Sequence, residues 1–407
     1  MAAPEPAPAK PAGPMSDLVV VEMGTLIAGP FCGQILGDFG AEVIKIEDPR
    51  NGDPMRQWGR TLPKGLSPWW PVIARNKKSV TLDLRTPEGQ EIARTLIAKA
   101  DVVIENFRPG ALEKWGLGWA QLSELNPRLI MARISGFGQT GPYAGRAGFG
   151  LVGESMGGLR YITGDPDRPP ARAGISIGDS LTGMHAALGI SMAVHARDRT
   201  GRGQLIDAAL YESVFAMMEN LVTEYDLTGY VRERSGSILP GLAPSNIYPC
   251  AEDEMILIGA NGDRVFERLA AAMSRPELKD DPRFCSHQSR GEHQAVLDAL
   301  IADWTRTRAL EGLLALMEEH GVPASRVYRA PEMLADPQFA AREAIIEADH
   351  PVFGGIKMQN AFPKLSETPG SVRWAGPALG EHTEAVLRER AGCSDGRIEE
   401  LRRKGVI

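Results

Sequence analysis

The sequence predicts an α/β fold built from more than one domain. From Leu18 to Ser135, short apolar runs alternate with stretches of helical periodicity. A polar stretch rich in Gly and Pro, Thr228–Pro249, interrupts the pattern. The chain of 407 residues is also longer than a typical single domain. Strands that alternate with helices are typical of a parallel sheet covered by helices.

The first β-α-β unit begins with the apolar run Leu18–Val21, which predicts a buried strand. A loop with Gly24 and Gly29 follows, then a helix that extends to Phe39, then a strand at Ala41–Ile46. Ligands of such units bind at the carboxyl ends of the strands.

A second unit starts with a strand at Ser79–Leu84. Thr86 and Pro87 are suited to the N-cap and the first position of a helix, and Val102–Glu105 returns as a strand. Leu129–Ile134 predicts another strand, which ends in a Gly-rich turn.

The rest of the chain predicts more helices than strands. We expect one strand, Met255–Ile258, and the helices Gly178–Arg197, Asp207–Tyr225, Arg264–Met273, Gln294–Trp304 and Glu381–Arg390, the last followed by a basic tail.

Composition excludes several classes of function. Apolar residues make up 43% and charged residues 24%, as in an ordinary globular protein, and the net charge is −7 without a basic stripe for nucleic acid. No apolar run approaches the roughly 18 residues of a membrane span. The four cysteines form no CxxC pair, so we expect no metal site and no disulfide framework, and a cytoplasmic location.

Asp179, in Ile177–Gly183, is a candidate catalytic residue whose role the local sequence does not decide. An Asp before an apolar-periodic helix is usually an N-cap, and this interpretation is favoured on position alone. The same free amides and helix dipole would also suit a carboxylate nucleophile. His185 and His195, on the same predicted helix, are more typical of packed or surface residues than of a catalytic base.

Basic residues cluster beside two predicted strands. Arg75, Lys77 and Lys78 precede one strand, and Arg108 and Lys114 follow another. Such residues are usually only solvated, but two clusters on one sheet favour an anionic ligand, because phosphates need several donors.

In these features the sequence resembles the class III CoA transferases, the CaiB/BaiF family that includes formyl-CoA transferase and carnitine CoA-transferase. The resemblance extends from Leu18 to Ile407. It rests on the segments Ala28–Pro30, Gly37–Glu47, Arg75–Ser79, Glu105–Gly110, Gly138–Pro142, Gly178–Asp179, Thr200–Gln204 and Leu379–Thr383.

The resemblance implies a Rossmann-like large domain with a parallel sheet, a smaller α+β domain, and an interlocked homodimer in which each chain forms a ring around the other. The expected parts are a disordered tail (1–16), the large domain (17–227, completed by about 375–407), a linker (228–249), the small domain (250–335) and a return linker (336–374).

It also implies a reaction with Asp179 as the catalytic residue. Asp179 attacks a donor acyl-CoA, and aspartyl anhydride and aspartyl-CoA thioester intermediates carry CoA to an acceptor acid. CoA thioesters are substrates, and no permanently bound cofactor is expected. The expected CoA contacts are Ile27, Ala28, Leu82, Asp83, Leu84, Arg85, Asn106, Phe107, Arg108, Lys114, Ser135, Gly136, Phe137 and Gly138.

Two positions depart from the family pattern. Asp48 stands where a basic residue often faces the nucleotide, so Arg50 or a neighbour is the expected substitute. Lys114 stands where Arg is common, which keeps the charge but loses the bidentate fork.

Three alternatives remain beside this interpretation. A 2-methylacyl-CoA racemase shares the fold, but Phe149 occupies the position of its histidine, and Phe cannot exchange a proton. A carnitine- or oxalate-type transferase and a non-catalytic acyl-CoA binding protein are the others.

Overall similarity favours the branch that transfers CoA from succinyl-CoA to dicarboxylates such as malate, citramalate, mesaconate, itaconate or glutarate. A second carboxylate needs a cation in the pocket, for which the candidates are Arg146, Arg160, Arg168 and Arg172.

Overall fold

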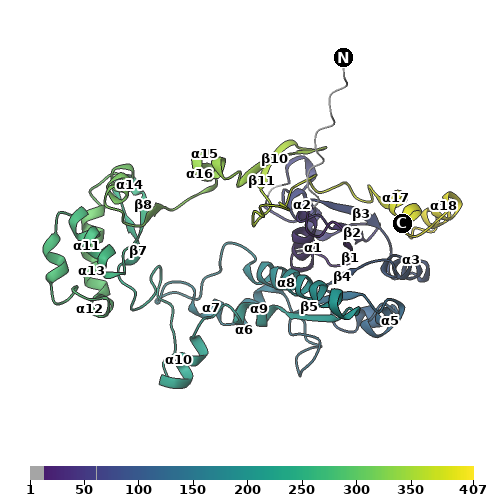
Figure 1. Cartoon of the computed structure of the whole chain (residues 1–407), viewed down its shortest axis with the longest axis horizontal. Helices are drawn as coiled ribbons and strands as arrows, with labels where there is room; N and C mark the ends of the chain where they lie inside the picture. Colours follow the sequence, from purple (N-terminus) through teal and green to yellow (C-terminus); the bar gives the residue numbers. More distant parts are fainter. Residues whose placement is uncertain (1–12, 61) are drawn as a thin grey trace, which may run out of the picture. The chain divides into compact units, whose positions relative to one another are not determined.

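The computed structural model describes residues 13–60 and 62–407, and it divides into two compact units (Figure 1). The large unit contains the chain up to Leu159, Ala173–Asn220 and Gln338–Ile407. The small unit contains Arg160–Arg172 and Leu221–Pro337. Most of the predicted disordered tail, residues 1–12, lies outside the described residues.

A six-stranded parallel sheet forms the centre of the large unit. Its strands are β1 (Val19–Glu22), β2 (Glu42–Glu47), β3 (Lys77–Thr81), β4 (Val102–Glu105), β5 (Ile130–Ser135) and β6 (Leu205–Ala209). Their order is β3-β2-β1-β4-β5-β6, so the direction of winding reverses between β1 and β4. This confirms the α/β class, and a reversal of this kind is where such sheets bind ligands.

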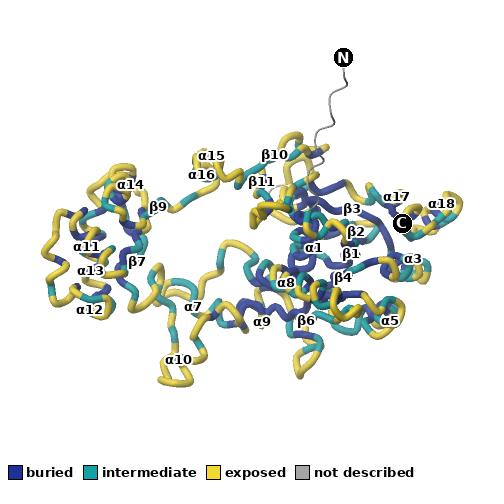
Figure 2. The backbone as a smooth tube through the Cα atoms, viewed as in Figure 1, coloured by how far each residue is buried: buried dark blue, intermediate teal, exposed yellow. Residues whose placement is uncertain are grey.

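Helices cover both faces of the sheet. Val20 packs in a core cluster with α1 (Ala28–Asp38) and α8 (Ile177–Thr200), whereas Val21 belongs to the cluster of the other face. That second face is covered by α3 (Pro87–Ile97), α17 (Thr383–Glu389) and α18 (Asp395–Arg403). Because helices cover both faces, most residues of β1–β5 are buried (Figure 2).

Most predicted elements of the large unit are confirmed to within a few residues. Thr86 caps α3, and its side chain accepts a hydrogen bond from the amide of Gly89 at 3.1 Å. The predicted helix Asp207–Tyr225 is wrong, because its first residues pair with β5 as strand β6. Two short helices follow, α9 (Leu210–Phe215) and α10 (Leu221–Thr228). The predicted basic tail contains the helix α18, which Ser394 caps.

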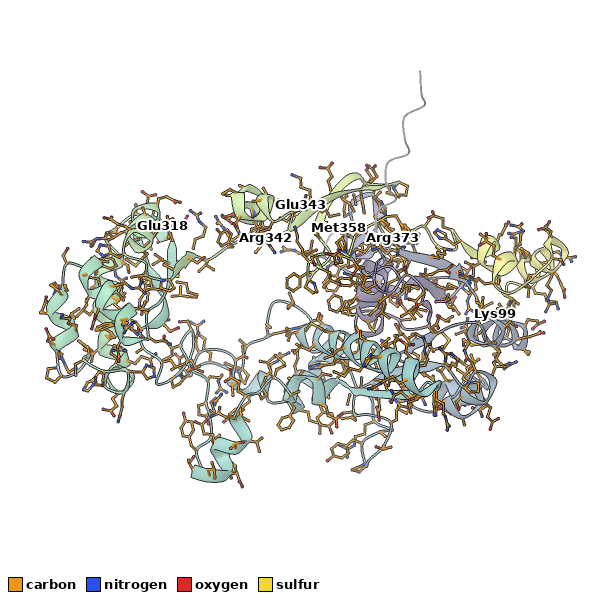
Figure 3. All side chains as sticks on the ribbon, viewed as in Figure 1. Lys99, Glu318, Arg342, Glu343, Met358 and Arg373 are labelled. Carbon is orange, nitrogen blue, oxygen red and sulfur yellow. The ribbon has the colours of Figure 1, made fainter. Side chains whose placement is uncertain are left out.

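The C-terminal part of the chain returns to the large unit. Within the predicted return linker, β10 (Ile345–His350) and β11 (Gly354–Gln359) form an antiparallel hairpin. Arg373, labelled in Figure 3, then donates hydrogen bonds to the carbonyl oxygens of Gly37 and Ala41. These bonds tie the returning segment to the end of α1.

The small unit has its own antiparallel sheet and apolar core. The sheet order is β7 (Ser245–Pro249), β8 (Met255–Gly259) and β9 (Ala324–Arg326). The principal helices are α11 (Asp263–Ala272), α13 (Gln294–Thr305) and α14 (Leu310–Glu319). Among the described residues of both units, the remaining α-helices are α2 (Trp69–Ile73), α4 (Ala111–Lys114), α5 (Trp119–Leu125), α6 (Gly150–Met156), α7 (Leu159–Ile162), α12 (His287–Glu292), α15 (Ala330–Ala335) and α16 (Pro337–Ala341).

Candidate active site

Asp179 lies in the first turn of α8. The helix begins at Ile177 and Ser176 occupies the N-cap position, so the interpretation of Asp179 as the N-cap is wrong. Asp179 is the third helical residue and is only partly buried. The free amides and the positive end of the helix dipole at this terminus favour an ionised carboxylate.

The carboxylate of Asp179 rests against the backbone of α6. A Cβ atom at Gly150 would lie 2.1 Å from Oδ2 of Asp179, and a Cβ at Gly178 would lie 3.0 Å from the carbonyl oxygen of Gly150. Two residues without side chains therefore allow the first turns of α6 and α8 to approach closely. The Asp179 carboxyl group occupies the space that a side chain at Gly150 would fill.

Phe149 precedes Gly150 and holds the N-cap position of α6. Its ring is 45% exposed, and its centroid lies 6.3 Å from that of Trp58. An aromatic hydrocarbon ring thus stands beside the Asp179 region, and it supplies no acid or base there.

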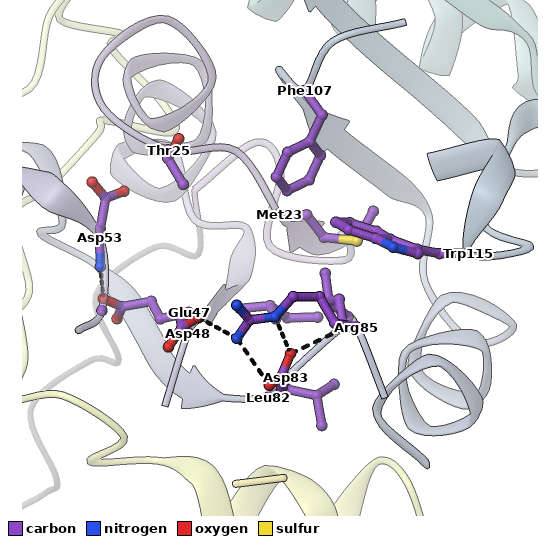
Figure 4. Close-up of a pocket in the computed structure, with 13 residues that line it drawn as sticks. Met23, Thr25, Glu47, Asp48, Asp53, Leu82, Asp83, Arg85, Phe107 and Trp115 are labelled. Atoms are coloured by element: carbon purple, nitrogen blue, oxygen red, sulfur yellow. Dashed lines mark hydrogen bonds and ion pairs between the residues drawn. The ribbon is translucent and has the colours of Figure 1, made fainter. Parts of the chain in front are cut away.

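A pocket of about 200 Å³ opens at the carboxyl ends of β1–β4, where the winding of the sheet reverses (Figure 4). Part of its wall is apolar: the rings of Phe107 and Trp115 meet edge to face, with centroids 5.5 Å apart, next to Met23. Five of the predicted CoA contacts line it, namely Leu82, Asp83, Leu84, Arg85 and Phe107.

Charged side chains form the rim of this pocket. Figure 4 shows the guanidinium group of Arg85 between the carboxylates of Asp48 and Asp83, each at 2.7 Å. Arg50 also pairs with Asp48, at 2.9 Å. Burial raises the pKa of Asp83 despite the nearby charge of Arg50. Burial also acts to raise the pKa of Asp48, but the hydrogen bonds and charge of Arg50 outweigh it and lower that pKa.

The other predicted CoA contacts do not line the pocket. Asn106 instead holds the loop after β1: it accepts from the amide of Thr25 and donates to its carbonyl oxygen, both at 2.8 Å. Ile27 and Ala28 are buried at the start of α1, and Arg108 and Lys114 are exposed around α4.

The predicted contacts Ser135–Gly138 follow β5. A Cβ at Gly136 would lie 2.6 Å from the Cα of Gly148, so this turn packs against the segment that leads to α6. The ring of Phe137 lies 5.9 Å from that of Tyr143. The turn therefore borders the Asp179 region and not the pocket.

Of the four candidate arginines for a second carboxylate, Arg146 belongs to the large unit, where its guanidinium stacks 3.6 Å from the centre of the Tyr143 ring. Arg160, Arg168 and Arg172 belong to the small unit.

The basic cluster at the start of β3, where Lys77 and Lys78 are the first two strand residues, does not form an anion site. Arg75 pairs with Asp38 at 2.6 Å, and Lys77 is fully buried and pairs with Glu22 at 2.8 Å. Lys78 pairs with Glu42 at 2.7 Å. The interpretation of these residues as an anion-binding cluster is wrong, because internal carboxylates already neutralise them.

Sequence reasoning did not single out seven of the residues that line the pocket, and Glu47, Asp53 and Trp115 are among them. Glu47 ends β2, and Asp53 follows it after a short loop. The signal was the position of Glu47 at the end of a predicted strand, where side chains of a parallel sheet meet ligands.

Within the described ranges, no group of three or more His, Cys, Asp or Glu side chains is arranged to hold a metal ion. Among the helices of those ranges, none has both the length and the apolar character needed to cross a bilayer.

Comparison with known proteins places this geometry in a family. The model of CoA-transferase family III matches residues 15–383. A succinyl-CoA–D-citramalate CoA-transferase of Chloroflexus aurantiacus is 58% identical over 98% of this chain and 99% of its own length. A succinate–glutarate CoA-transferase of Agrobacterium fabrum is 36% identical, over 92% of this chain and 95% of its own.

A solved structure agrees with this assignment. The crystal structure of a CaiB/BaiF family protein from Brucella suis superimposes with a TM-score of 0.83 at 36% sequence identity, covering 93% of this chain and 99% of that one. The chain therefore belongs to CoA-transferase family III and is a CoA transferase that acts on CoA thioesters.

Proposed function

We propose that this CoA transferase moves CoA from succinyl-CoA to a small dicarboxylate, with Asp179 as the nucleophile. The observation that carries the role of Asp179 is its carboxylate, held at the start of α8 against Gly150. The 58% identity to a D-citramalate transferase supports D-citramalate as the first acceptor to test. Malate, mesaconate, itaconate and glutarate follow as related acids.

The proposed reaction exchanges acyl groups at one carboxylate. Asp179 attacks the succinyl carbonyl, the C–S bond breaks, and CoA leaves as a thiolate. The thiolate then attacks the aspartyl carbonyl of the mixed anhydride, which releases succinate and leaves an aspartyl-CoA thioester. The acceptor carboxylate attacks the same carbonyl and expels the thiolate again. Attack of the thiolate on the acceptor carbonyl forms the new thioester and restores Asp179.

The local structure supports this role in two ways. Amides in the first turn of α8 favour negative charge where the carboxylate and the oxyanion of its acylated form would lie. The pocket at the switch point of the sheet supplies apolar rings and the guanidinium group of Arg85 for part of the coenzyme. We assign Leu82, Asp83, Leu84, Arg85 and Phe107 as the CoA contacts of this pocket. Arg50 would take the place of the basic residue that the family often has where this chain has Asp48.

We also propose that two copies of the chain form the interlocked homodimer that the resemblance implies. On α8, Met184, Leu188 and Met192 follow one another at intervals of four residues and are 50%, 51% and 61% exposed. Residues spaced in this way share one face of a helix, and an apolar stripe is a typical contact surface. The domain boundaries and the cytoplasmic location remain predictions.

Trapping of the acyl-enzyme tests the role of Asp179. The protein is incubated with succinyl-CoA and then with hydroxylamine or borohydride, and the modified peptide is mapped by mass spectrometry. We expect modification at Asp179, and a loss of transfer of more than about a thousandfold in Asp179→Ala. Modification at another residue, or none with any donor, would refute the proposal.

A panel of acceptors tests the substrate. Transfer from succinyl-CoA to D-citramalate, L-malate, mesaconate, itaconate and glutarate is compared with transfer to oxalate and carnitine. We expect the dicarboxylates with four or five carbon atoms to be the better acceptors. If carnitine or oxalate exceeds all of them, the assignment to this branch is wrong while the role of Asp179 stands.

A further inference from the structure

The loop between β1 and α1, residues Gly24–Ile27, contains an unfavourable backbone conformation. Leu26 has φ of +66°, in the left-handed region that a leucine side chain disfavours. Such conformations persist only where the surroundings fix them, and they concentrate at functional sites. The contacts of the loop show what fixes it.

Three side chains bond to consecutive residues of this loop. The ammonium group of Lys45 donates to the carbonyl oxygen of Gly24 at 2.8 Å. Asn106 bonds both backbone polar groups of Thr25, as described above. Oδ1 of Asp53 accepts from the amide of Leu26 at 3.1 Å. Lys45 lies within β2, whereas Asp53 and Asn106 lie in the segments that follow β2 and β4.

Lys45 and Asp53 are themselves paired in the interior. Their charged atoms lie 2.9 Å apart, and both side chains are 1% exposed. Glu22 lies between Lys45, at 3.0 Å, and Lys77, at 2.8 Å. Two ammonium groups thus balance two carboxylates. A buried ion pair is a poor source of net stability, because desolvation offsets the attraction, whereas it fixes geometry well.

The anchored loop contacts both parts of the candidate site. On one side, Thr25 and Asp53 line the pocket. On the other side, the loop leads into α1, where the carbonyl oxygen of Ala28 would lie 2.6 Å from a Cβ at Gly183 of α8. Gly183 is one helical turn after Asp179. The position of this loop therefore sets the distance between the pocket and the nucleophile.

We propose that Lys45 and Asp53 are positioning residues for acyl transfer: they hold the Gly24–Ile27 loop in place, with Leu26 in its left-handed conformation, and so align a bound CoA thioester with Asp179. This inference rests on the proposed function. Neither residue was singled out by sequence reasoning, since their roles depend on contacts with a loop about 20 to 30 residues earlier in the chain.

The main test is Asp53→Asn, which keeps the shape of the side chain and one acceptor oxygen but removes its charge. We expect kcat/KM for succinyl-CoA to fall roughly tenfold to a hundredfold, with a rise in KM, because misplacement of bound groups by about 1 Å has effects of this size. Hydrogen exchange of the amides in residues 23–31 should accelerate in the same variant.

Asp101→Asn is the matched control. Asp101 also accepts from a backbone amide, that of Val19 at 2.9 Å, and pairs with a buried base, Arg197, at 2.9 Å. It precedes β4 and so lies at the amino ends of the parallel strands, whereas the pocket lies at their carboxyl ends. We expect Asp101→Asn to lower the melting temperature while kcat and KM stay within about twofold, since the site is distant from it.

A second comparison tests the conformation of Leu26 itself. Glycine adopts the left-handed region without penalty, so Leu26→Gly should reduce the effect of Asp53→Asn on kcat/KM when the two changes are combined. If Asp53→Asn does not fold, the double variant Lys45→Met/Asp53→Asn, in which the charges balance, takes its place.

The outcomes separate this inference from the proposed function. If Asp53→Asn and Asp101→Asn change kcat/KM to the same extent, or if exchange of residues 23–31 is unchanged, the positioning role is refuted. If the unmodified protein forms no adduct at Asp179, the proposed function fails. The exchange measurement still decides whether Asp53 anchors the loop.

Discussion

At Gly150, the absence of a side chain decides where the Asp179 carboxylate can lie. The carboxyl group fills the space of the missing Cβ, and the backbone of α6 limits its movement on that side. A nucleophile held in this way loses little freedom when it attacks a thioester. The glycine is therefore part of the geometry of the candidate site, although it contributes no functional group.

Gly150→Ala should impair activity and leave stability almost unchanged. The three atoms nearest to the new methyl group all belong to the Asp179 carboxyl group, which is the flexible end of that side chain and can be displaced. We expect kcat with succinyl-CoA to fall roughly tenfold to a hundredfold. Steady-state kinetics and a thermal unfolding curve measure the two effects.

Gly145→Ala is the control for this change, since a Cβ at Gly145 would meet no atom within 4 Å. We expect it to keep the activity of the unmodified protein. Equal activity of Gly150→Ala and Gly145→Ala would show that the Asp179 carboxylate does not act from the position described here.

Single residues also show where sequence reasoning reaches its limit. Asp179 is the candidate nucleophile because its motif fits the family over the whole chain. Local patterning predicts that it is an N-cap, whereas it lies three positions after the N-cap residue Ser176. Lys77 was visible as a charge, but its partner Glu22 lies 55 residues earlier (77 − 22), so its burial was not. Neutralisation by a distant residue leaves no local signal.

The elements themselves were predictable where burial is strong on both sides. β1, β2, β4 and β5 read as apolar runs because helices cover both faces of the sheet. β6 is an edge strand with one neighbour, and its residues Leu205–Ala209 include only two that are buried. Its strand conformation comes from pairing with β5, which overrides a sequence that also suits a helix.

Glu47, the last residue of β2, lines the pocket and so connects this strand to the site. Its carboxylate accepts from Arg56 through two hydrogen bonds of 2.8 Å and from Ser79 at 2.6 Å. Burial by itself acts to raise the pKa of Glu47. The hydrogen bonds and charge of Arg56, with the charge of Lys45, outweigh it and lower the pKa below its ordinary value of 4.5.

This shift predicts a pH-dependent stability. A carboxyl group whose pKa is lower in the folded state stabilises the fold above its unfolded pKa, and this contribution is lost as the pH falls through the folded pKa. At pH 7, Glu47→Gln should lower the free energy of unfolding by about 3 kcal/mol, because it leaves the buried Arg56 without its counter-charge. Below pH 4.5 the difference from the unmodified protein should shrink.

Urea unfolding curves of both proteins between pH 7 and pH 3 measure this difference directly. The comparison removes the contribution of every other carboxylate, since both proteins share them. A difference that stays constant across this range would show that Glu47 does not bear a lowered pKa in the fold.

At the scale of the whole molecule, local patterning does not predict which separate parts of the chain form one unit. The Gly- and Pro-rich stretch after Thr228 lies in the small unit of the structure, and residues from Gln338 onward return to the large unit. A return of this kind depends on long-range contacts such as those of Arg373, which no local pattern encodes. Helix periodicity, in contrast, predicted α11 and α13 of the small unit well.

The proposed interlocked dimer has a consequence that an ordinary dimer lacks. Two chains that pass through one another cannot separate unless part of each chain unfolds, whereas subunits that only touch dissociate and reassociate. The apolar stripe Met184, Leu188 and Met192 would be buried in either case. Exchange of subunits therefore distinguishes the two arrangements.

We expect the protein to have twice the chain mass of 44.0 kDa in light scattering, and to keep it on dilution. When affinity-tagged and untagged dimers are mixed under native conditions, no mixed dimers should form over hours. After both are unfolded in urea and refolded together, about half of the dimers should be mixed, because random pairing of two equal pools gives that share. Rapid mixing without urea would refute interlocking but not dimerisation, and a mass of one chain would refute both.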